Sequence, residues 1–503
     1  MTVPPKLPAP TAARAEEPVL AVADIQGNVL PGFNTRHQTL LGLRFDGDAR
    51  RWLAAVLPDV STLADVHGYR LVRRQARLAG ETPAASPVWV NVAFAANGLA
   101  ALGAGVEAIR DPRFRQGMGE ASNLGDPRAR DHPGHPSRWV VGGTPAKTPD
   151  ALVIVASDDP AAVRERVAHL GDGMTVVYEQ EGHGLDGEIE HFGFRDGISS
   201  VGARGRLDRS AGSHLTRRTI DSDRFGRPGQ PLVWPGQFVF GYPRQRADDP
   251  VKPGPVSRGG HPWMDNGSFL VFRRLRQDVA AFRRFVEWES GRLRDAGHTA
   301  MTSERLAALL VGRWPAGTAL MRNAEGDDPD PMADVATVND FGFAGDRFGR
   351  VCPSFAHIRK VNPRDLPTDK GGPDRTLTFA VLRRGIPWGE PYPSTPAGQA
   401  LDQGDRGLLF LCYQTSIKDQ FEVLNTDWMN RRNGPEGDAG HDLLVGQGDG
   451  PNRERAADLR DAESGAAPDR ISTLIEWVVP TGGGYFFAPS ISALRHFAHG
   501  DPG

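Results

Sequence analysis

Residues 190–200 (EHFGFRDGISS) bring a carboxylate into a stretch suited to a tight turn. Asp196 lies three residues after Gly193 and directly before Gly197. Because glycine allows backbone conformations that other residues avoid, such a turn can hold a carboxylate close to a ligand. An aspartate held in this way could act as a general acid or base, although a solvated Asp-Gly turn is the commoner role of this dipeptide.

Residues 351–364 (VCPSFAHIRKVNPR) place a histidine, His357, among apolar neighbours. A lone histidine in such surroundings is usually a hydrogen-bonded residue of the core. Arg359, Lys360 and Arg364 follow it closely, and a group of cations of this kind favours an anionic ligand.

Residues 376–389 (TLTFAVLRRGIPWG) combine a predicted strand with two arginines and a turn. The strand is expected over residues 376–382, and Arg383 and Arg384 stand at its end, before Gly385 and Pro387 turn the chain. An arginine at such a strand end either points into a pocket or lies in solvent.

Strands and helices that could position these residues recur in both halves of the chain. Apolar spacing predicts strand–helix units followed by further strands over residues 37–57, 88–102, 152–181, 268–288, 376–382, 407–424 and 484–487. No predicted strand is followed by the GxGxxG turn of a doubly wound fold. The pattern therefore predicts two related α+β units with antiparallel or mixed sheets.

Composition excludes several other classes of protein. The chain has 503 residues and a formal net charge of −3, so it lacks the basic surface expected of a nucleic-acid partner. Its longest apolar runs, such as residues 151–156 and 408–412, are far shorter than the roughly 18 residues that cross a bilayer. Two cysteines cannot build a disulfide framework. Residues 1–23 show no secretion signal, so we expect a flexible tail and a cytoplasmic location.

The three segments, in this order, resemble the dye-decolorizing peroxidases, a family of haem peroxidases, and in particular their larger fungal-type and related bacterial branch. Four further segments carry the same resemblance, which extends from about residue 24 to residue 494: DIQGNVLPGF (24–33), NGSFLVFRRLRQDVA (266–280), GLLFLCYQ (407–414) and PTGGGYFFAPSISAL (480–494).

The resemblance implies an α+β fold of two ferredoxin-like modules with mainly antiparallel sheets and peripheral helices. We expect an N-terminal module over residues 24–211, an irregular connection over 212–262, and a C-terminal module over 263–503 that binds haem b (iron protoporphyrin IX). It also implies residue roles: His357 as proximal iron ligand, Asp196 as distal acid–base, Arg383 in O–O cleavage, Arg359 as propionate partner, and Leu408 and Phe410 lining the distal side.

The implied reaction is the oxidation of dyes and of phenolic or other aromatic reductants by hydrogen peroxide, through a ferryl intermediate. An aspartate keeps its basic form to a lower pH than a histidine does, so we expect the highest activity in acid. Trp388 and Tyr392 could carry electrons from bulky dyes, although ordinary packing is the favoured role for both. Two alternatives remain: a haem-binding or haem-delivery protein with incidental peroxidase activity, and a non-enzymatic ferredoxin-like binding module. The oligomeric state and the natural reductant stay open.

Overall fold

The computed structural model describes residues 16–119, 124–210, 212–328, 330–331, 337–393, 404–448, 452–460 and 468–500. Its centre is a nine-stranded sheet with the strand order β11-β13-β10-β16-β2-β3-β1-β4, and β12 pairs with β13 beside β11. All pairs within this sheet are antiparallel.

The N-terminal half contributes four of these strands, in the order β2-β3-β1-β4. They are β1 (His37–Arg44), β2 (Trp89–Phe94), β3 (Ala151–Ser157) and β4 (Thr175–His183). Every residue of β2 and β3 is buried, which explains why both strands are apolar except for Asn91 and Ser157. The helices α1 (Ala49–Val56), α2 (Leu63–Leu78) and α5 (Pro160–Gly171) begin at side-chain caps from Asp48, Thr62 and Asp159.

The C-terminal half repeats this arrangement with β11 and β12 in the place of β2. Its strands are β10 (Ser268–Gln277), β11 (Leu382–Arg383), β12 (Ile386–Trp388), β13 (Gly407–Gln414) and β16 (Val478–Ala488). The helix α6 (Val279–Asp295) follows β10, and a π-helix, η10 (Ile417–Met429), follows β13. The shared strand order confirms the predicted pair of ferredoxin-like modules.

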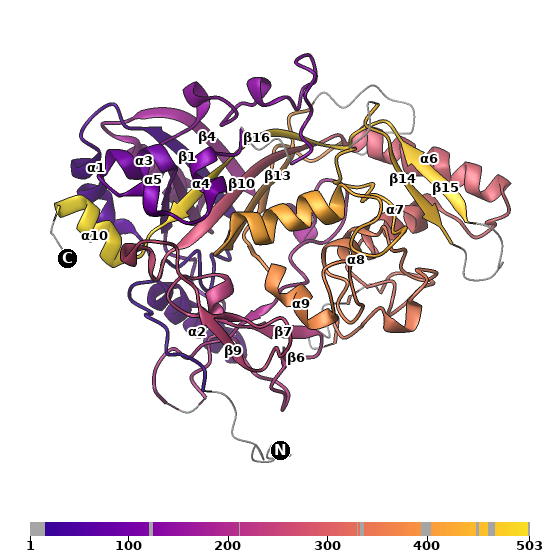
Figure 1. Cartoon of the computed structure of the whole chain (residues 1–503), viewed down its shortest axis with the longest axis horizontal. Coiled ribbons are helices and arrows are strands. Elements are labelled where there is room, and N and C mark those ends of the chain that lie inside the picture. The colour runs from indigo at the N-terminus through magenta and orange to yellow at the C-terminus, as the bar shows by residue number, and fades with distance from the viewer. Residues whose placement is uncertain are drawn as a thin grey trace.

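Two seams join the modules into one curved sheet. At one seam β16 pairs with β2, and Phe487 lies opposite Phe94. At the other, β12 lies against β4, where a Cβ on Gly182 would stand 2.6 Å from Ile386 Cγ2. In Figure 1, α10 (Ile491–His499) lies beside α1 at one end, and α6 and the β14–β15 pair gather at the other.

The remaining elements are short and surround this sheet. They are α3 (Ala96–Ala101), α4 (Pro112–Gln116), β5 (Gly202–Ala203), β6 (Phe225–Arg227), β7 (Gln230–Val233), β8 (Pro243–Gln245), β9 (Pro253–Val256), α7 (Ser303–Val311), α8 (His357–Val361), α9 (Pro373–Thr376), β14 (Arg455–Leu459) and β15 (Asp469–Thr473). Within the described residues, no helix is long and apolar enough to cross a membrane.

Two local predictions need comment. The strand predicted over 376–382 is wrong: α9 and a 3₁₀ turn (Leu377–Phe379) occupy most of it, because Pro373 favours the first turn of a helix. Residues 1–15 of the predicted tail lie outside the described residues. Residues 16–23 pack against the rest of the protein, since Glu17 and Leu20 are buried and Glu17 accepts a hydrogen bond from Arg204 at 3.1 Å.

Candidate functional site

His357 begins α8 and is held by a buried carboxylate. Its Nδ1 lies 2.7 Å from Asp442 Oδ2, and the Asp442 side chain is 0% exposed. Asp442 Oδ1 in turn accepts the backbone N–H groups of Leu444 and Val445 at 3.0 and 3.1 Å. An ionised carboxylate only accepts hydrogen bonds, so Nδ1 carries the proton and the Nε2 lone pair is available to a metal. Sequence reasoning missed Asp442, because it lies 85 positions after His357 and no motif links the two.

The two cations after His357 fasten α8 to the segment that carries Asp442. Lys360 is buried, and its Nζ donates to the carbonyl oxygens of Arg431, Gly434 and Gly440. Burial lowers the pKa of Lys360 to about 7, because desolvation penalises the charged ammonium. These bonds fix the histidine relative to its carboxylate partner.

The predicted role of Arg359 as a propionate partner receives no support from its geometry. The side chain is 0% exposed, and all five of its N–H groups have protein acceptors. Nε and Nη2 donate to the Glu436 carboxylate at 3.1 and 3.2 Å, and Nη1 donates to the carbonyl oxygens of Asp346 and Cys352, both at 2.9 Å. Nη2 also donates to the Arg347 carbonyl at 3.3 Å. The guanidinium therefore anchors α8 and offers no donor to a ligand.

A turn after β4 brings Asp196 to Arg383. Gly193 and Gly197 have φ values of 99° and 75°, which a side chain would strain. Arg383 Nη1 lies 3.5 Å from Asp196 Oδ1, and Nη2 donates to the Ser199 carbonyl at 2.8 Å. The Arg383 and Asp196 side chains are 40% and 43% exposed. This pair, from different modules, is the only one among the predicted site residues that the described structure records in contact.

Leu408 and Phe410 lie on the same side of the sheet as Arg383. On β13 they alternate with the buried Leu409 and Leu411, and both are only partly buried. Arg383 is opposite Cys412 in the β11–β13 register, and Cys412 shares a face with Phe410 and Leu408 because side chains alternate along a strand. The strand therefore places an apolar surface beside the arginine.

Two further arginines, Arg313 and Arg364, lie beside this turn. Sequence reasoning named Arg364 but missed Arg313. Arg313 Nη2 donates to Ser199 Oγ at 2.7 Å and to Asn339 Oδ1 at 2.6 Å, and the Arg364 guanidinium stacks on Phe341 at 3.7 Å from the ring centre. Burial lowers the pKa of Arg313 to about 9, and the charge of Arg364 adds to this. Because the acceptors recorded for Arg313 are neutral, the cluster suits an anionic ligand.

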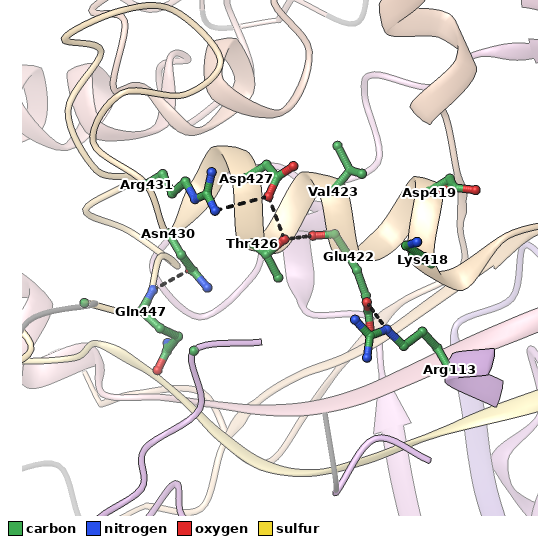
Figure 2. A pocket seen from close by; sticks show the side chains of 12 residues that line it. Arg113, Lys418, Asp419, Glu422, Val423, Thr426, Asp427, Asn430, Arg431 and Gln447 are labelled. Atoms are coloured by element: carbon green, nitrogen blue, oxygen red, sulfur yellow. Dashed lines mark hydrogen bonds and ion pairs between the residues drawn. The ribbon is translucent and has the colours of Figure 1, made fainter. Parts of the chain in front are cut away.

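A cavity of about 700 Å³ lies elsewhere, along η10 (Figure 2). None of the predicted site residues lines it. Four of its charged groups form two pairs: Arg113 Nε lies 2.8 Å from Glu422 Oε2, and Arg431 Nη2 lies 4.0 Å from Asp427 Oδ1. The lining of this cavity therefore does not include His357, Asp196 or Arg383.

Glu190 holds the turn that carries Asp196, and it predicts a pH dependence of stability. Its carboxylate accepts the backbone N–H groups of Phe192 and Phe194 at 2.9 and 3.0 Å, and Gln277 donates to it as well. Burial nevertheless raises the pKa of Glu190 from 4.5 to about 7. The unfolded chain thus loses this proton at lower pH than the folded protein does, so folding stability falls as the pH rises from about 4.5 to about 7.

Through Glu190, the native protein should lose about 3 kcal/mol of folding stability between pH 4.5 and pH 8. Glutamine does not titrate, so the stability of Glu190→Gln should fall by about 3 kcal/mol less over the same range. Denaturant unfolding of both proteins, in the same haem state, at these two pH values measures the difference. Equal pH dependence in the two proteins would show that folding does not change the pKa of Glu190.

Comparisons with known proteins identify the family of both halves of the chain. A family model described as "DyP dimeric alpha+beta barrel domain" matches residues 24–185, and one described as "Dyp-type peroxidase, C-terminal" matches residues 241–439. The dye-decolorizing peroxidase msp1 of Mycetinis scorodonius is 30% identical over 526 residues, covering 98% of this chain and 92% of that protein.

Solved structures show the same likeness. An ancestral D-type dye decolorizing peroxidase superposes with a TM-score of 0.76 at 29% identity, covering 95% of this chain and 99% of that one. A dye-decolorizing peroxidase in complex with 2,6-dimethoxyphenol gives a TM-score of 0.72 at 26% identity, covering 95% and 100%. With matching family models over both modules and a full-length relative, the chain belongs to the dye-decolorizing peroxidase family and is a peroxidase.

Proposed function

We propose that this peroxidase binds haem b between His357 and the Asp196–Arg383 pair, and uses hydrogen peroxide to oxidise dyes and phenolic or other aromatic compounds. The observation that carries the proposal is the His357–Asp442 hydrogen bond of 2.7 Å, with the carboxylate wholly buried. A carboxylate–histidine pair of this kind is the usual arrangement behind a metal-binding imidazole.

The chemistry of the donor groups fits haem. Among the described residues, no three His, Cys, Asp or Glu side chains could hold a bare metal ion together, so His357 would be a single protein ligand. Arg313 and Arg364 would meet the two propionates, and Leu408 and Phe410 would cover the apolar ring. When bound, the haem would supply the redox-active iron.

Asp196 would carry the proton. Its Oδ1 faces the Gly197 N–H at 2.6 Å and the Arg383 guanidinium, which leaves Oδ2 to take a proton from one peroxide oxygen and return it to the other. Arg383 would stabilise the negative charge on the departing oxygen, because its guanidinium offers positive charge and several N–H donors.

The aromatic reductant is proposed from a relative, since one family member was solved with 2,6-dimethoxyphenol. Trp388 cannot meet a bulky dye directly, because it is 1% exposed and lies beneath Arg274, 4.2 Å from the ring centre. Tyr392 is partly buried between Arg283 and Arg406. Neither residue presents an open aromatic surface.

Haem titration followed by mixing with peroxide tests the proposal. The native protein should gain a Soret band, and His357→Ala should lose it, while the exposed His169→Ala behaves like the native protein. An unchanged Soret band and affinity in His357→Ala would refute the ligand assignment. If Asp196→Asn and Arg383→Ala both react with peroxide at the native rate, haem delivery becomes the better function.

A further inference from the structure

Arg384, the neighbour of the distal arginine, binds a loop from the opposite end of the chain. Its Nε donates to the Asn28 carbonyl at 2.9 Å, and its Nη2 donates to the carbonyls of Val29 and Pro31, both at 3.0 Å. Its remaining recorded bond runs from Nη1 to the carbonyl of Arg383, at 2.9 Å. One guanidinium thus joins the loop to the backbone of the distal arginine.

The loop is shaped to receive this side chain. A Cβ on Gly32, whose φ is +95°, would stand 2.1 Å from Arg384 Nε. Arg70 reaches the same loop, since its Nη2 donates to the Gly32 carbonyl at 2.6 Å. Gly32, the second glycine of the DIQGNVLPGF segment, therefore suits both the positive φ and the close approach of Arg384.

Buried polar groups fix the loop to the central sheet. Gln26 accepts the Val92 N–H at 2.9 Å and donates to the Pro489 carbonyl at 2.7 Å. Asn28 Nδ2 donates to the Tyr413 hydroxyl at 3.3 Å, which donates to Asn91 Oδ1 at 2.6 Å. These bonds reach β2, β13 and the end of β16, so the carbonyls that face Arg384 are held rigidly.

Arg383 gains from this support because a short ladder holds it, in which it lies opposite Cys412 of β13 and the Arg384 N–H donates to the Leu411 carbonyl at 2.7 Å. Its strand, β11, has two residues and stands at the edge of the sheet. Within the described part of the chain, the Arg384 guanidinium donates to carbonyl oxygens and to no carboxylate, so its desolvation carries a cost in free energy, and burial lowers its pKa to about 10. An apolar side chain in place of Arg384 would avoid this cost, but it could not donate a hydrogen bond to the Arg383 carbonyl.

We propose that Arg384 is a positioning residue that holds the Arg383 backbone so that its guanidinium meets Asp196 and the Ser199 carbonyl. The inference rests on the role proposed for Arg383. It implies that the DIQGNVLPGF loop contributes to the reaction with peroxide by holding Arg384 and, through it, the Arg383 backbone.

A double-mutant cycle on the haem-loaded, full-length enzyme tests it. Lysine keeps the charge but lacks the planar fork that reaches several carbonyls, so Arg384→Lys should slow the reaction with H₂O₂ about 10-fold. Arg383→Ala should slow it about 100-fold. The double variant should match Arg383→Ala within about twofold, because Arg384 acts only through Arg383.

Arg70→Lys is the matched control, since it alters one contact to the Gly32 carbonyl and leaves the Arg384 bonds and the buried bonds of the loop in place, so it should keep the native rate. Gly32→Ala is a second variant that displaces the Arg384 guanidinium by steric contact, and it should repeat the non-additivity with Arg383→Ala. Hydrogen exchange in haem-free protein adds a readout apart from activity: residues 381–386 should exchange faster in Arg384→Lys than in Arg70→Lys.

The outcomes separate the two proposals. The positioning role is overturned if Arg383→Ala is slow while Arg384→Lys reacts at the native rate. It is also overturned if adding Arg384→Lys to Arg383→Ala slows the reaction by a further 10-fold. In both cases the role proposed for Arg383 is kept. Equal slowing by Arg70→Lys would also overturn the positioning role. A native rate in Arg383→Ala would instead refute the proposed role of Arg383, and the inference with it.

Discussion

Asp196→Asn should slow the reaction with H₂O₂ by about 10²- to 10⁴-fold, the range typical of losing a positioned acid–base group. Asparagine keeps the shape of the side chain and can still accept the Gly197 N–H, so the turn should persist. The amide cannot take up and return a proton, however. Stopped-flow absorbance of the haem-loaded protein against peroxide concentration measures the second-order rate constant.

The exposed carboxylate of Asp186, ten residues earlier, provides the control for this change. Its side chain pairs only loosely with Arg36, at 3.4 Å, and Asp186→Asn should keep the native rate. A loss of less than about threefold in Asp196→Asn would assign the proton transfer to another group.

Asp442→Asn should weaken haem binding by about 10- to 100-fold. With its amide oxygen facing the Leu444 and Val445 N–H groups, the new side chain would present an NH₂ group to His357 Nδ1. Nδ1 must then give up its proton to accept this bond, which moves the proton to Nε2 and removes the lone pair that iron needs. Titration of haem-free protein with haem, followed by absorbance, gives the dissociation constants.

Asp458→Asn controls for the loss of a carboxylate from the same part of the protein. Asp458 lies on β14 and binds Arg432 at 2.6 Å, away from the imidazole. The Asp442 prediction fails if the two variants bind haem equally well, or if Asp442→Asn retains native affinity.

The sequence allowed the fold and part of the site to be predicted, for different physical reasons. Apolar spacing is a local signal, so the long strands of the sheet and some helices were visible, and their repetition predicted two related α+β units. The order of the strands depends on pairing between distant segments and was not predicted from that pattern. The roles expected for Asp196 and Arg383 came from the resemblance of whole segments to a family, since the turn residues beside each of them are equally typical of solvated turns.

Contacts between distant residues were not predictable in the same way. Asp442 lies 85 positions after His357, and no periodicity links them. Arg359 shows the converse error: a cation beside a candidate ligand suggested an anion site, but its acceptors are Glu436 and carbonyls of the preceding turn. The sequence indicated Arg384 only as the neighbour of Arg383. Its hydrogen-bond partners were not predictable, because they lie more than 350 positions earlier in the chain.

The place of β16 in the sheet has a consequence for folding kinetics. This strand, Val478–Ala488, lies between β10 and β2, and its Phe487 is opposite Phe94, which stands 393 positions earlier in the chain. Closing so long a loop costs conformational entropy before the pairing stabilises the sheet. Until β16 is in place, β2 and β10 each keep an unpaired edge. We therefore expect chaperones that cover strand edges to matter more for this protein than for one built from independent domains.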